Sequence, residues 1–118
     1  MKNRGLTTRL KNALAGIHHV WRRERSFRAQ VGTGVAAVTF FVWWGLPLYW
    51  WALITIAITL VLAAELVNSG IEALADHLHP EHHPAIGKVK DMAAGMVLVM
   101  ALAAVVIGVL AILSNPGS

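Results

Sequence analysis

Acidic and amide side chains recur at helical spacing near the middle of the chain. Three carboxylates and one amide follow one another at steps of three, four and four residues: Glu65, Asn68, Glu72 and Asp76. On an α-helix these steps place all four side chains on one stripe. A long apolar segment precedes the stripe, since residues 29–64 contain no Asp, Glu, Lys or Arg. Polar groups at the end of such a segment are costly in a membrane, so we expect them to be functional.

Two kinds of chemistry suit carboxylates in this position. A carboxylate can take the proton of an alcohol as a general base, and Glu65, nearest the apolar segment, is best placed to meet a lipid headgroup. One or two carboxylates can also hold Mg²⁺ beside nucleotide phosphates, and Glu72 and Asp76 lie nearer to water. The structural alternative is that the stripe only holds neighbouring helices together.

Further candidates lie outside the stripe. Glu24 is the only acidic residue among the first 64. It could complete a metal site with Glu72 if the N-terminal segment folds back, or it could only pair with neighbouring arginines on the surface. Lys90 can reach a phosphate from what we expect to be the start of a helix, where anions are favoured. A snorkelling lysine beside a capping Asp91 explains the same pair equally well.

Composition indicates an integral membrane protein. Of the 118 residues, 57% are hydrophobic and 14% are charged, whereas soluble domains carry about a quarter charged residues. Eight of the ten basic residues fall in the first 28 positions, which favours a cytoplasmic flank on an anionic membrane over nucleic-acid binding. This basic segment is too long and mixed for a cleaved signal peptide, so we expect it to belong to the mature protein.

The apolar pattern predicts an all-α membrane fold. We expect an amphipathic interfacial helix, three spanning helices and a cytoplasmic connection, in a single membrane domain over 1–118: 5–28 for the interfacial helix, 31–48, 50–78 and 92–113 for the spans, and 79–90 for the connection. All ten basic residues then lie on one side, so the N-terminus and the connection are predicted to be cytoplasmic. Aromatic residues at 43–51 form a belt at the far interface, although an aromatic core cluster is the alternative.

Several other site types are disfavoured. Four histidines occur between 77 and 83, but cysteine is absent and prolines interrupt the spacing, so a zinc site is not expected. Gly87-Lys88 lacks the remainder of a phosphate-binding P-loop. A non-enzymatic assembly subunit or ion-conducting oligomer remains open as the alternative to an enzyme, although it gives Glu24 no role.

Four segments of the chain resemble the prokaryotic diacylglycerol kinase family, which includes undecaprenol kinases. They are Glu65 to Asp76, Pro80 to Pro84 with Lys90 to Gly95, and Glu24 to Arg28. The resemblance implies a homotrimer in the bacterial cytoplasmic membrane, with active sites at subunit boundaries. It also implies MgATP-dependent phosphorylation of a lipid alcohol.

Carried over by position, the resemblance implies a role for each matching residue. Glu65 matches the catalytic base, Asn68 its polar partner, and Glu24 and Glu72 the Mg²⁺ ligands. The nucleotide contacts match these two acids and five other residues: Glu81, His82, His83, Lys90 and Asp91. Lipid contacts match Arg28, Glu65 and Ala94.

The chain departs from the proteobacterial diacylglycerol kinases in two places. Gly5 and Asn12 stand where those kinases use an arginine and a tyrosine, and Arg4 or Arg9 is a candidate substitute for the arginine. The Ala93-Ala94-Gly95 segment and His83-Pro84 look more like the undecaprenol kinase branch. Diacylglycerol and undecaprenol therefore both remain open as the substrate.

Overall fold

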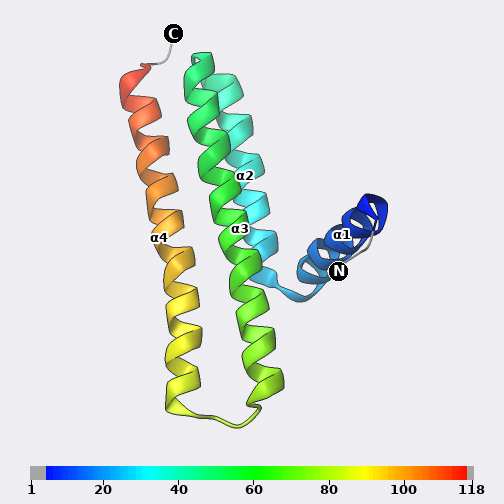
Figure 1. Ribbon diagram of the computed structural model, residues 1–118. Coiled ribbons are helices and arrows are strands. Elements are labelled where there is room, and N and C mark those ends of the chain that lie inside the picture. Colours follow the sequence, from blue (N-terminus) through cyan, green and yellow to red (C-terminus); the bar gives the residue numbers. More distant parts are fainter. Residues whose placement is uncertain (1–4, 117–118) are drawn as a thin grey trace.

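The computed structural model describes residues 5–116, which form four helices joined by short turns (Figure 1). The helices are α1 (Leu6–Arg23), α2 (Arg25–Trp44), α3 (Leu48–Leu78) and α4 (Pro84–Ser114). Helices α2, α3 and α4 run alongside one another, whereas α1 lies at a steep angle beside the middle of α3 (Figure 1). The all-helical fold predicted from the apolar pattern is confirmed.

The predicted interfacial helix over 5–28 is wrong at its C-terminal end. Helix α1 ends at Arg23, and Glu24 is extended, with φ −112° and ψ 111°. Arg28 stabilises this break, because its Nη1 donates to the carbonyl oxygens of Trp21 at 2.5 Å and Arg22 at 3.2 Å. These carbonyls belong to the last turn of α1, which has no helical partners for them. The break places Glu24 at the corner between α1 and α2, which begins at Arg25 rather than at residue 31.

The turn between α2 and α3 contains a glycine with positive φ and is surrounded by aromatic residues. Gly45 ends α2 with φ +84°, a conformation that disfavours any side chain. Trp44 Nε1 donates to the carbonyl of Asn115 at 2.6 Å, which joins the ends of α2 and α4. Three of the ring residues, Trp44, Trp50 and Trp51, pack against buried residues of the helix core, whereas Trp43 and Tyr49 are exposed. Part of the aromatic cluster therefore packs in the helix core, and the exposed part is the candidate for an aromatic belt at a membrane interface.

The predicted connection over 79–90 is too long. Helix α4 begins at Pro84, and only residues 79–83 separate it from α3. Proline is favoured in the first turn of a helix, where its missing N–H costs nothing. His83 caps the same turn, since its Nδ1 accepts a hydrogen bond from the Ala85 amide at 3.1 Å. Lys90 and Asp91 therefore lie in the second turn of α4, and the expected anion site at a helix start does not include them.

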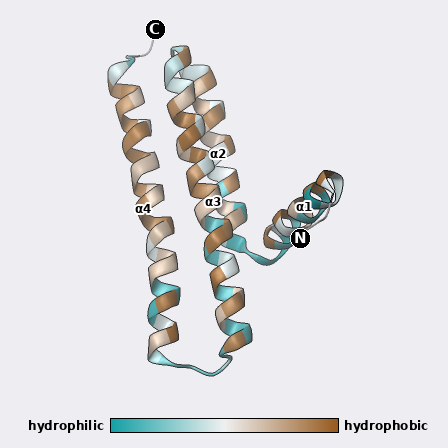
Figure 2. Cartoon of the chain, in the orientation of Figure 1, coloured by the Kyte–Doolittle hydropathy of each residue, from teal (hydrophilic) through white to brown (hydrophobic). Residues whose placement is uncertain are grey.

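Helices α3 and α4 are long and apolar enough to cross a membrane. Helix α2 does not meet that criterion, because it contains two arginines, Gln30 and two glycines among its apolar residues. Hydrophilic residues gather at the connected ends of α3 and α4 and around the α1–α2 junction (Figure 2). Many large apolar side chains face outward, above all along α4. The described residues thus expose apolar surface of the kind that lipid or another protein covers.

Candidate active site

A cleft of about 600 Å³ separates α1 from the second half of α3. Small residues make room for it, namely Ala13 and Gly16 on α1 and Gly70 and Ala73 on α3. Glu24, Glu72 and Asp76 line the same cleft, together with Arg23 and His19. Glu24 and Glu72, the two acids that the sequence suggested as partners in a metal site, therefore line one cleft.

Glu65 lies deeper than this cleft and faces α2. Its side chain is 3% exposed, the only charged group among the buried residues of the described chain. Ser26 Oγ donates a hydrogen bond to Glu65 Oε2 at 3.1 Å. The other carboxylate oxygen, Oε1, accepts no hydrogen bond from residues 5–116. A buried carboxylate with one oxygen held and one oxygen uncommitted can accept a proton from an incoming hydroxyl.

Asn68 lies between Glu65 and Glu72 on the stripe and contacts Glu72. Its Nδ2 donates to Glu72 Oε1 at 3.0 Å, one helical turn further along α3. Asn68 Oδ1 is enclosed and has no hydrogen-bond partner among the described residues. Buried acceptors in native proteins are nearly always paired. The amide therefore orients Glu72 and leaves its own oxygen open to a further donor.

A second cavity, of about 240 Å³, lies between the end of α3 and the start of α4. Four of the predicted nucleotide contacts line it: Glu81, His82, His83 and Lys90. Lys90 Nζ forms an ion pair with Asp76, and Asp76 lines both this cavity and the larger cleft. Asp76 is thus the one residue that the two linings share.

Five predicted site residues line neither cavity, and two of them, Glu65 and Asn68, form the hydrogen bonds described above. Asp91 and Ala94 are exposed on α4 and line neither cavity. Arg28 also lines neither, and its guanidinium is used at the α1–α2 break. Of the two candidate substitute arginines, Arg9 is exposed on α1 and Arg4 lies outside the described residues.

Sequence reasoning missed the partners that α1 and α2 supply. The sequence pattern predicts no role for Ser26, Arg23 or His19, which the structure places at the buried carboxylate and in the cleft. A usable signal was present in α1, where Ala13, Gly16 and Val20 recur at helical steps on one face. Small residues on such a face permit close approach of another helix.

The donor set of the cleft suits a hard cation that also binds phosphate. Within residues 5–116, no group of three or more His, Asp or Glu side chains could hold a metal ion. Glu24 and Glu72 offer carboxylate oxygens to one cleft, and Mg²⁺ is commonly held by one or two carboxylates completed by substrate phosphates. The residues therefore fit Mg²⁺ bound together with a nucleotide, rather than a closed protein site.

Comparison with known proteins identifies the family. The family model for prokaryotic diacylglycerol kinase matches residues 11–112. A diacylglycerol kinase from Escherichia coli K12 is 31% identical over 91 residues, covering 77% of this chain and 75% of the relative. One from Synechocystis is 33% identical over 104 residues, covering 87% and 59%. The undecaprenol kinase of Bacillus subtilis is 33% identical over 95 residues, covering 80% and 77%.

These relatives confirm the expected enzyme class and remove the non-enzymatic alternative. A kinase also requires a nucleotide or similar phosphoryl donor. The chain is a lipid kinase and belongs to the prokaryotic diacylglycerol kinase family.

Proposed function

We propose that this protein transfers the γ-phosphoryl group of ATP to the hydroxyl of diacylglycerol, which gives phosphatidic acid and ADP. Undecaprenol, giving undecaprenyl phosphate, is the alternative acceptor, because an undecaprenol kinase is about as similar as the diacylglycerol kinases. The observation that carries the proposal is the layout of the stripe. A buried carboxylate lies at the apolar end, and two carboxylates line an open cleft at the polar end.

We assign roles to Glu65 and Glu72 by their positions along α3, with Glu65 nearer the apolar end and Glu72 nearer the polar end. Glu65 and Glu72 are two helical turns apart, about 10 Å along α3. That interval has room for a hydroxyl, the γ-phosphoryl group and a cation. The hydroxyl oxygen forms a bond to γ-phosphorus as the bond from phosphorus to the bridging oxygen of ADP breaks. Glu65 Oε1 takes the hydroxyl proton, while Ser26 holds Oε2 in place.

The cleft residues position and neutralise the phosphates, as phosphoryl transfer requires. Glu24 and Glu72 would hold Mg²⁺, which neutralises phosphate charge when bound. Asn68 keeps the Glu72 carboxylate oriented through its 3.0 Å hydrogen bond. Arg23 and His19 line the same cleft and offer donors to phosphate oxygens. Lys90, with Glu81, His82 and His83, is assigned to the outer part of the nucleotide. Asp91, Arg28 and Ala94 remain candidate contacts on resemblance alone.

The membrane arrangement follows from the same assignment. We place α2, α3 and α4 across the bacterial cytoplasmic membrane, as a single membrane domain, with the N-terminus and the site on the cytoplasmic side. The basic residues near the site support this orientation. Helix α1 then lies in the interface, where its outward apolar side chains would meet lipid: Leu6, Leu10, Leu14, Ile17 and Trp21.

A homotrimer with shared sites completes the proposal. Apolar side chains along α4 face outward over most of its length, and a single chain encloses its cleft only partly. A neighbouring copy could cover this surface and supply further site residues. Asp91 and Ala94, which line no cavity within one chain, are candidates for such contacts.

Phosphorylation by purified protein in mixed micelles tests the proposal. Dioleoylglycerol and undecaprenol are offered separately with MgATP, and labelled lipid phosphate is measured. Glu65→Gln should lower kcat by about a hundredfold or more, the usual contribution of a general base. His18→Gln, on α1 but outside the cleft, is the matched control and should retain activity. Full activity in Glu65→Gln would contradict the assignment of the base, and no product from either lipid would contradict the reaction.

A further inference from the structure

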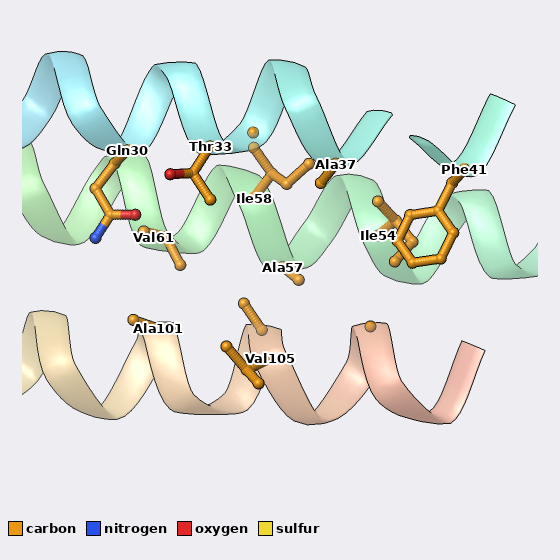
Figure 3. Close-up of a pocket in the computed structure, with 13 residues that line it drawn as sticks. Gln30, Thr33, Ala37, Phe41, Ile54, Ala57, Ile58, Val61, Ala101 and Val105 are labelled. Carbon is orange, nitrogen blue, oxygen red and sulfur yellow. The ribbon is translucent and has the colours of Figure 1, made fainter. Parts of the chain in front are cut away.

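A third cavity, of about 250 Å³, lies among the apolar parts of α2, α3 and α4 (Figure 3). Small residues on all three helices leave this space, among them Gly34, Ala57, Ala104 and Gly108. Phe41 and Ile54 close its far end, next to the hydrogen bond between Trp44 and Asn115. The result is an apolar groove that is closed at the aromatic end.

One polar group stands at the opposite end of the groove. Only Gln30 and Thr33 among the lining residues have polar side chains. Thr33 Oγ1 already donates to the carbonyl of Ala29 at 2.9 Å. The half-buried Gln30 side chain makes no hydrogen bond within residues 5–116, and Figure 3 shows it extending from α2 across α3, in the direction of α4. An amide in apolar surroundings is stabilised by a partner, so a ligand with an acceptor is favoured there.

The register of the helices places Gln30 close to the proposed base. Gln30 follows Ser26 by one turn of α2, and Val61, which also lines the groove, precedes Glu65 by one turn of α3. Ser26 and Glu65 are hydrogen-bonded. Residues one turn apart on a helix face are about 5–6 Å apart. The Gln30 amide is therefore separated from the Glu65 carboxylate by about one helical turn.

We propose that the groove binds one acyl chain of a glycerolipid and that Gln30 Nε2 donates a hydrogen bond to its ester carbonyl. This inference rests on the proposed reaction at Glu65. In diacylglycerol the ester carbonyls lie a few bonds from the free hydroxyl, a separation that one helical turn can match. A polyprenol has no polar group besides its hydroxyl, so it leaves Gln30 without a partner. Sites with a fixed donor discriminate against analogues that lack the acceptor, so Gln30 favours diacylglycerol over undecaprenol.

A comparison of three lipid alcohols tests the inference in the full-length protein. Dioleoylglycerol, its dioleyl diether analogue and undecaprenol are each phosphorylated with MgATP in mixed micelles. The diether keeps the chains and the hydroxyl but lacks both carbonyls. The wild type should prefer the diester over the diether by about tenfold in kcat/KM, as the loss of one hydrogen bond implies. Gln30→Leu should lower kcat/KM for the diester to that of the diether and leave the other two lipids unchanged.

Thr39→Val serves as the matched control. Thr39 is exposed on α2, bonds the carbonyl of Val35 at 2.9 Å and does not line the groove, so the lipid preference should persist. Equal rates on diester and diether in the wild type would overturn the inference, as would an equal loss on all three lipids in Gln30→Leu. A wild-type preference for undecaprenol would overturn it while leaving the kinase reaction intact. Only the absence of product from all three lipids would contradict the proposed function itself.

Discussion

Ser26 Oγ on α2 donates a hydrogen bond to Glu65 Oε2 on α3 at 3.1 Å, across 39 positions of sequence. The bond joins the start of one helix to the middle of another. It fixes the carboxylate at the depth where apolar residues give way to the polar stripe. Ser26 is exposed, whereas Glu65 is buried. The serine therefore acts as a positioning residue between the buried carboxylate and the surface.

Ser26→Ala should lower kcat about tenfold, because Glu65 loses a hydrogen bond to its charged form. The KM for ATP should not change, since Ser26 lines neither nucleotide cavity. Ser26→Thr retains the hydroxyl and should restore most of the rate. Steady-state kinetics on diacylglycerol measure these effects. In a Glu65→Gln background, Ser26→Ala should add little further loss. Additive losses in the double variant would indicate that the two side chains act independently.

Gly45→Ala should destabilise the protein by about 1 kcal/mol, because a Cβ is strained at φ +84°. Unfolding of detergent-solubilised protein by heat or denaturant measures the change. Gly32→Ala is the matched control, since Gly32 lies inside α2 with no atom near an added Cβ. That substitution should be neutral or slightly stabilising. Equal effects at the two glycines would show that the turn conformation is not the cause.

The sequence was sufficient for the helical class, the polar stripe and the apolar segments, because these depend on periodicity within one helix. Helix ends were less predictable. The predicted connection includes Pro84 although this residue begins α4, since a proline is compatible with both a helix start and a helix stop. The residue type at position 24 does not predict the helix break. The break is stabilised by hydrogen bonds from the Arg28 side chain to the end of α1.

Contacts between helices were the least predictable part of the site. The sequence suggests that Glu24 joins Glu72 if the N-terminal segment folds back, but the geometry depends on how α1 packs beside α3. Asp76 was recognised on the stripe, yet its ion pair with Lys90 requires two helices to meet. Such contacts arise from packing geometry, which the order of residues in one helix does not specify.

Lys90→Met should raise the KM for ATP about tenfold, because a charge-assisted contact to phosphate is lost. The ion pair with Asp76 is on the surface, with side-chain exposures of 36% and 62%. Its loss should therefore cost only about 0.2–1 kcal/mol of stability. The exchanged pair Lys90→Asp with Asp76→Lys separates the two roles. If the ammonium must stand on α4 to meet phosphate, the exchanged pair should stay impaired in nucleotide binding. Recovery of the wild-type KM would instead assign Lys90 to holding α3 and α4 together.

Glu24→Gln and Glu72→Gln should each raise the Mg²⁺ concentration for half-maximal activity by tenfold or more. An amide keeps the shape of the side chain but removes a charged oxygen ligand, and both residues line one cleft. Binding of Mn²⁺ in the presence of a non-hydrolysable ATP analogue, followed by electron paramagnetic resonance, gives a second readout that does not depend on turnover. His18→Gln, on α1 but outside the cleft, should bind Mn²⁺ as the wild type does. Glu65→Gln should lose turnover yet keep Mn²⁺ binding, because Glu65 faces Ser26 rather than the cleft. Unchanged Mn²⁺ affinity in both Glu24→Gln and Glu72→Gln would place the cation elsewhere.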